Sequence, residues 1–131
     1  MKYKNNKRNS NDEIDKKTLI NLMKEEHNYP NPDDDDFDMY IITWDKNQYS
    51  PIHDHSANGC IYKVLQGNIV EELYNNDLKL NNSQLIYENV IRYIDNNIGY
   101  HKMTNYTNNI VVTLHIYSPP NYKVNYFNQS H

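Results

Sequence analysis

Hydrophobic residues near the N-terminus recur with a helical period. After a polar stretch over residues 1–11, Leu19, Leu22 and Met23 mark one face of a helix. The prolines that follow cannot continue a helix, so it is expected to end before them. The pattern predicts a disordered tail over residues 1–11 and a short helix followed by an acidic loop over residues 12–36.

The run Asp33–Asp36 in that loop allows two interpretations. Four adjacent like charges repel one another and favour a solvated loop. A calcium site is the alternative, but calcium loops interleave their ligands with glycine and spacer residues, which this run lacks. We therefore expect a solvated loop.

From residue 37 onward the pattern changes to short segments rich in Tyr, Ile and Val, separated by Asn and Gly. Such segments, with no helix between them, are typical of an all-β sandwich or barrel. The sequence therefore predicts one β-barrel domain over residues 37–131. Its strands are expected at residues 38–44, 51–56, 60–66, 69–74, 84–88, 90–94, 100–106 and 110–117.

Charge and composition narrow the classes of function. The formal net charge of -4 gives no general attraction for nucleic acid. No apolar run approaches the roughly 18 residues of a membrane span, and the N-terminus is too polar for a signal peptide. The single cysteine, Cys60, excludes an intramolecular disulfide. We expect a cytoplasmic monomer without nucleic-acid or membrane partners.

The triplet His53-Asp54-His55 is the first candidate for chemistry. On a strand, alternate side chains point to the same face, so the two histidines would converge while Asp54 faces the other way. That arrangement suits a metal ion. The alternative is a pair of ordinary surface histidines.

Two stretches resemble the two motifs of the cupin superfamily. The stretch from His53 to Gly67 resembles the first motif, with Cys60 at the position of its acidic ligand. Gly99-Tyr100-His101 with Asn105 resembles the second motif, whose histidine completes the metal site from across the barrel. The resemblance implies an all-β cupin barrel, here preceded by one short helix.

Within the cupins, the chain resembles the cysteine dioxygenase family. The resemblance covers roughly residues 37 to 122 and includes Trp44 ahead of the first histidine. Four stretches carry it in order: Ser50-Pro51-Ile52-His53-Asp54-His55; Cys60 with Lys63-Val64-Leu65-Gln66-Gly67-Asn68; Tyr93-Ile94-Asp95-Asn96 with Ile98-Gly99-Tyr100-His101; and Leu114-His115-Ile116-Tyr117-Ser118-Pro119-Pro120.

This resemblance implies an iron-dependent dioxygenase that converts L-cysteine and O2 to cysteine sulfinate. Its Fe(II) ligands would be His53, His55 and His101. Three neutral imidazoles would leave the full +2 charge on the metal and an open face for a thiolate and O2.

His115 and Tyr117 are two residues apart, so they share a strand face, and Thr113 continues that line. The resemblance implies a hydrogen-bonded relay that ends at the Tyr117 hydroxyl, with His115 and Tyr117 in catalysis. It also implies a Cys60–Tyr117 thioether crosslink and a cis Ser118–Pro119 bond. The alternative is that His115 and Tyr117 are ordinary interior residues.

The chain departs from the family where the substrate carboxylate is bound. The family places an arginine in a Tyr-x-Arg-Asn stretch, whereas this chain reads Tyr29-Pro30-Asn31-Pro32. Asn31 cannot supply the charge of a guanidinium. Tyr29, Tyr49 and Arg92 remain as candidates for binding the substrate.

Two further functions stay open beside cysteine oxidation. The first is dioxygenation of another small thiol, such as a mercapto acid or an aminothiol, because the Tyr29–Pro32 segment has no arginine to bind a carboxylate. The second is a catalytically inactive, metal-binding cupin. The retained histidines and the Cys60/Tyr117 pair favour an enzyme.

Overall fold

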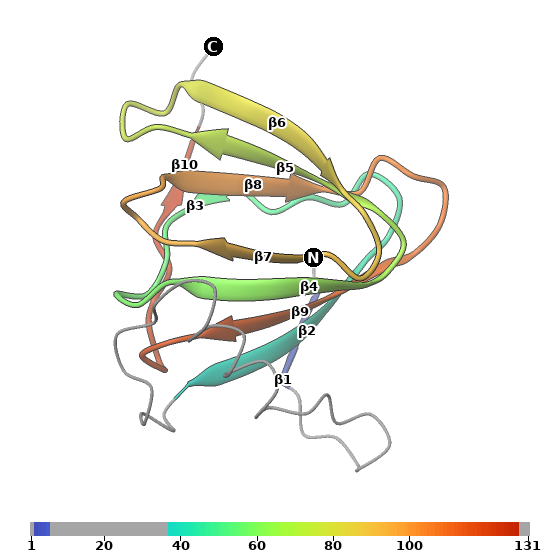
Figure 1. Cartoon of the computed structure of the whole chain (residues 1–131), viewed down its shortest axis with the longest axis horizontal. Coiled ribbons are helices and arrows are strands. Elements are labelled where there is room, and N and C mark those ends of the chain that lie inside the picture. Colours follow the sequence, from blue (N-terminus) through green and yellow to red (C-terminus); the bar gives the residue numbers. More distant parts are fainter. Residues whose placement is uncertain (1, 6–36, 129–131) are drawn as a thin grey trace.

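The computed structural model describes residues 2–5 and 37–128, and within them it forms two five-stranded antiparallel sheets (Figure 1). The strands are β1 (Lys2–Asn5), β2 (Asp38–Trp44), β3 (Ile52–His53), β4 (Cys60–Gln66), β5 (Ile69–Tyr74), β6 (Leu80–Ile86), β7 (Ile91–Ile94), β8 (Tyr100–Thr104), β9 (Val111–Tyr117) and β10 (Tyr126–Phe127). The predicted all-β architecture is thereby confirmed. The predicted helix, Tyr29, Asn31 and the acidic run lie outside the described residues.

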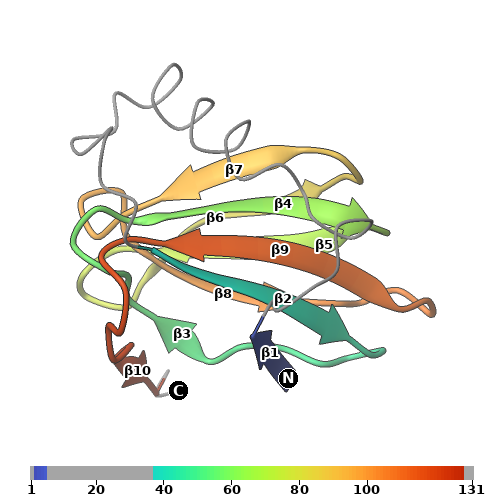
Figure 2. The same ribbon diagram turned by 90° about the horizontal axis from the view of Figure 1, so that it is seen from below.

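Each sheet combines strands that are distant in sequence. The first sheet has the order β1-β2-β9-β4-β7 and the second the order β10-β3-β8-β5-β6. Figure 2 shows β10, near the end of the chain, lying beside β3. The central strands of one sheet therefore face those of the other across a shared interior.

Several strand assignments differ from the sequence prediction, and β10 was not expected at all. The expected strand over residues 51–56 is reduced to Ile52–His53, and β6 begins at Leu80 although residues 81–84 are polar and exposed. Pairing with β5 explains β6, because backbone hydrogen bonds override weak strand propensity. Lys2–Asn5, in the segment predicted to be disordered, pairs with the edge of β2 instead. Gly67 lies in the turn between β4 and β5, and its φ of 80° suits glycine.

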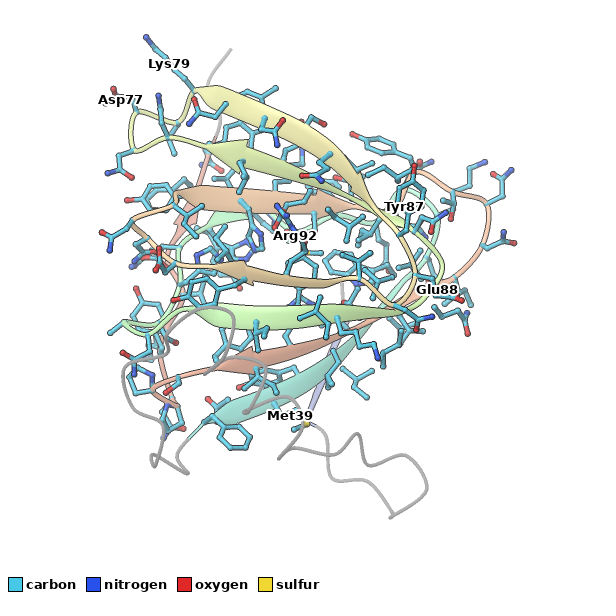
Figure 3. All side chains as sticks on the ribbon, viewed as in Figure 1. Met39, Asp77, Lys79, Tyr87, Glu88 and Arg92 are labelled. Atoms are coloured by element: carbon cyan, nitrogen blue, oxygen red, sulfur yellow. The ribbon has the colours of Figure 1, made fainter. Side chains whose placement is uncertain are left out.

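The core lies on both faces of the first sheet. One cluster fills the space between the sheets and includes Cys60, Tyr62 and Val64 from β4. Alternate residues such as Ile61 and Met39 join a second cluster on the opposite face of that sheet, where Figure 3 labels Met39. The inward face is the one that also carries the candidate site.

In the part of the chain that the structure describes, no helix is long and apolar enough to cross a bilayer.

Asn105 ties the end of β8 to the end of β2. Its side-chain amide donates to the backbone carbonyls of Trp44 and Asn109, at 3.0 Å and 2.8 Å, and its oxygen accepts from Thr107. The residue is completely buried. It therefore satisfies carbonyl groups that would otherwise be left unpaired inside the protein.

We predict that Asn105→Ala lowers the free energy of unfolding by about 2 to 4 kcal/mol, because buried carbonyls lose their donors. Chemical denaturation followed by circular dichroism measures the loss. The neighbouring exposed residue Asn108 offers a matched control, and Asn108→Ala should change stability by less than about 0.5 kcal/mol. Equal effects of the two substitutions would contradict this role for Asn105.

Candidate metal centre

Three histidines converge at the pairing of β3 with β8. His53 and His101 are direct partners across these strands, and their ring centroids lie 4.5 Å apart. His55 lies two residues beyond the end of β3, and its ring lies 4.6 Å from that of His101. One ring nitrogen from each residue lies within 4.8 Å of the others. All three side chains are buried, so the structure gathers them inside the barrel and not on its surface.

The environment favours neutral imidazoles with a free lone pair. Burial lowers the pKa of His53, His55 and His101, and the last two fall well below the ordinary value. Nδ1 of His53 lies 2.8 Å from the Pro51 carbonyl and donates to it, which leaves Nε2 as an acceptor. Neither ring nitrogen of His55 has a hydrogen-bond partner among the described residues. An unpartnered, buried imidazole beside two others fits a metal ion.

Asn96 fixes the backbone that carries His55. Its side-chain oxygen accepts from the His55 amide at 2.9 Å, and its amide donates to the His55 carbonyl at 3.1 Å. These two bonds connect the loop after β3 to the turn before β8. The turn that leads into the strand of His101 is thus hydrogen-bonded directly to the backbone of His55.

Glu71 orients His101 from behind. One carboxylate oxygen accepts from Nδ1 of His101 at 2.8 Å, so Nε2 of His101 is left for a metal. The other oxygen accepts from the Arg92 guanidinium at 3.2 Å. Glu71 is 2% exposed and sits on β5. Figure 3 shows Arg92 reaching from β7 toward the second sheet, where this contact forms.

The sequence analysis missed Glu71, although a signal was present. Ile69, Glu71 and Leu73 alternate along β5 and therefore share one face, and Ile69 and Leu73 belong to the interior cluster. An acidic residue at an inward position of an apolar strand is rarely buried without a partner. The partner, His101, could not be identified before the β5–β8 pairing was known.

Beside the three histidines lies a second buried group on β9. The Trp44 indole donates to the Thr113 hydroxyl at 2.8 Å, and this hydroxyl lies 2.7 Å from Nε2 of His115. Nδ1 of His115 faces the Cys60 sulfur at 3.9 Å. Burial lowers the pKa of His115 to about 3, so its ring is neutral at ordinary pH.

Tyr117 completes this group. Its ring lies parallel to that of His115, with centroids 6.1 Å apart, and it is the direct partner of Cys60 across β4 and β9. Burial raises the pKa of the Cys60 thiol, which therefore stays protonated. The Ser118–Pro119 bond that follows is cis, as the resemblance implied.

A cavity of about 470 Å³ opens beside Tyr117. Ser56, next to the candidate ligand His55, also lines it, and the ring of Tyr126 in its wall lies 6.1 Å from the ring of His53. The candidate metal ligands are buried behind this wall. The cavity therefore lies next to the histidines on the side of Ser56 and Tyr126, although none of the three histidines lines it.

The remaining candidate residues lie elsewhere. Tyr49 is 55% exposed and lies under the Lys102 ammonium, 4.7 Å from its ring centre. It lines a separate cavity together with Ile52. The Arg92 guanidinium is engaged with Glu71, as described above.

Comparison with known proteins decides the family. The family model Cysteine dioxygenase type I matches residues 4–130. This chain belongs to that family. It is 35% identical over 91 residues to cysteine dioxygenase type 1 of Homo sapiens, and 33% identical over 92 residues to that of Danio rerio. Both matches cover 64% of this chain and 46% of the relative, so the chain spans about half the length of these relatives.

Solved structures confirm the cupin fold. A structure of oxalate oxidase with the substrate analogue glycolate has a TM-score of 0.59 at 16% identity, covering 69% of this chain and 45% of that one. A conserved protein from Klebsiella pneumoniae with a double-stranded β-helix domain has a TM-score of 0.61 at 12% identity, covering 73% and 78%. A Drosophila melanogaster CENP-C cupin domain has a TM-score of 0.53 at 12% identity, covering 63% and 68%. At these identities the likeness concerns the fold alone.

We predict that Glu71→Gln in this cysteine dioxygenase family member lowers metal affinity by about tenfold to a hundredfold, because His101 loses an anionic partner that raises its donor strength. Competition with a chromophoric chelator under nitrogen measures the affinity. Glu72→Gln, one residue along the same strand, is the matched control and should leave it unchanged. His101→Ala gives the metal affinity expected when a candidate ligand is lost. Wild-type metal affinity in Glu71→Gln would contradict the proposed role of Glu71.

Proposed function

We propose that this chain is an Fe(II)-dependent thiol dioxygenase that oxidises L-cysteine to cysteine sulfinate with O2. The convergence of three buried, neutral histidines beside a cavity lined by Tyr117 supports the proposal most directly. Membership of the cysteine dioxygenase type I family supports the choice of reaction. A bound Fe(II) would supply the redox chemistry that activates O2 and the positions at which sulfur coordinates.

The ligand residues of the proposed site would be His53, His55 and His101. Because none of them carries charge, they would not offset the positive charge that attracts an anionic sulfur. The hydrogen bonds of His53 to Pro51 and of His101 to Glu71 fix the ring orientations in advance. Little rearrangement is then needed to complete the site.

Tyr117 is the group best placed to act on a molecule in the cavity. It lines the cavity and is 7% exposed, so a molecule in the cavity can contact its side chain. His115 lies behind it and is bonded to Thr113. With a pKa of about 3, His115 would orient Tyr117 and Cys60 and would not itself deliver a proton at neutral pH.

Another small thiol is the alternative substrate. Among the described residues, none of those that line the cavity is an arginine, so this part of the lining offers no bidentate clamp for a carboxylate. An inactive, metal-binding cupin is less well supported. Such a protein would have no chemical need for the buried Thr113–His115 pair next to Cys60.

Oxygen uptake tests the proposed activity. Protein reconstituted anaerobically with Fe(II) should consume O2 when cysteine is added and yield one sulfinate per O2, measured by an oxygen electrode and mass spectrometry. His101→Ala should be inactive because it loses iron. His115→Ala should keep iron and lose about a hundredfold in kcat. Stoichiometric iron without O2 uptake for any small thiol would exclude the enzyme.

We further predict that turnover in air forms a thioether between Cys60 and Tyr117. The two residues are direct cross-strand partners, so the sulfur and the phenol ring are adjacent. Forming the C–S bond removes one hydrogen from each residue, with O2 as the oxidant. Intact mass should therefore fall by about 2 Da, and Cys60→Ser should abolish the change. A free Cys60 thiol after many turnovers would contradict this prediction.

A further inference from the structure

We propose that Lys123 is the specificity residue of this site and binds the carboxylate of the thiol substrate. The inference rests on the proposed thiol oxidation and adds to it the chemical class of substrate. Lys123 lies on the strap, here defined as residues 119–127 between β9 and the end of β10. No feature of the sequence had pointed to this residue.

Lys123 lines the same cavity as Tyr117. Among the described residues, it is the only cation in the lining, whose walls are otherwise mainly tyrosine. The other cations near the centre are engaged elsewhere. Arg92 pairs with Glu71 behind His101, and Lys102 lies over Tyr49 beside a different cavity. An anionic group that enters next to Tyr117 would therefore find its positive partner at Lys123.

The strap is fixed on both sides of Lys123. The Tyr122 hydroxyl donates to Asp54 at 2.8 Å, and the backbone and side-chain amides of Asn125 donate to the same carboxylate, each at 2.8 Å. Asp54 is buried and lies between His53 and His55. The segment that carries Lys123 is thus tied to the triplet that carries two of the candidate ligands. This connection sets the position of the lysine backbone relative to the metal centre.

Two more polar groups line the cavity. The Ser56 hydroxyl is buried and has no hydrogen-bond partner among the described residues, so it can donate to a molecule in the cavity. Asp38, on the first sheet, contributes a negative charge to the same lining. The negative charge of Asp38 repels a substrate carboxylate, so the carboxylate is expected to bind near Lys123 instead. A small zwitterion or a mercapto acid matches this distribution of charge.

Lysine suits a solvent-facing position in this role. Its ammonium is a mobile point charge, whereas arginine offers a planar fork with two parallel donors. Because the Lys123 side chain is exposed, solvent screens its attraction, and the contact would be weaker than a buried bidentate pair. We therefore expect a discrimination of about tenfold and not of many thousandfold.

Steady-state kinetics on three thiols test the proposal. Lys123→Met should raise KM for cysteine and for 3-mercaptopropionate by about 5- to 30-fold with kcat nearly unchanged, because both thiols carry a carboxylate. KM for cysteamine, which has none, should stay within about twofold. Lys123→Arg should restore most of the affinity for the two carboxylates. Lys102→Met is the matched control, since it removes an equal charge next to the other cavity.

Anaerobic binding gives a second measurement that does not depend on turnover. Isothermal titration of the Fe(II) protein with each thiol should show the same loss for the two carboxylates and none for cysteamine. An equal loss for all three thiols, or none for any, would overturn the assignment of Lys123. A wild-type protein that oxidises no thiol but still shows the Lys123-dependent binding would instead refute only the proposed reaction.

Discussion

The site depends on the pairing of two short strands. β3 has only two residues, and it contacts β8 through the single pair His53 and His101. One pair of backbone partners is too little to fix a strand, so the site relies on further contacts. Pairing of β10 with the free side of β3, and the bonds of Asn96 to the loop after it, supply them. The candidate ligands are therefore positioned from three directions, although their own strand is minimal.

The buried polar side chains of the site are linked to one another by hydrogen bonds, which offset the cost of removing them from water. Glu71 is an anion inside the barrel, and such a charge is costly unless it is paired. His101 and Arg92 provide its partners, and Arg92 keeps part of its side chain near solvent. Thr113 plays a similar part for the second group, where it connects Trp44 to His115. The same bonds that make burial tolerable also fix the orientation of each imidazole.

Local pattern was enough to predict the all-β domain and to mark His53 and His55 as a candidate pair, because both follow from alternation along a strand. His53 and His55 were predictable from their spacing, and His101 from its resemblance to a cupin motif. Glu71 and the strap were not, since each acquires its role only through a partner distant in the chain. Asp54 shows the difference well. Alternation predicted that it faces away from the histidines, but not that it binds Tyr122 and Asn125, which lie about 70 residues later.

This arrangement separates the two tasks of the site. The strands carry the metal ligands and their supporting carboxylate, whereas the strap carries the proposed contact to the substrate carboxylate. The two parts are joined by the pairing of β10 with β3 and by Asp54, which accepts hydrogen bonds from residues on either side of Lys123. The Lys123 side chain takes no part in these bonds, because Asp54 is bound through its neighbours. Substrate preference could therefore change at this position while the histidines, Glu71 and the fold of the barrel stay as they are.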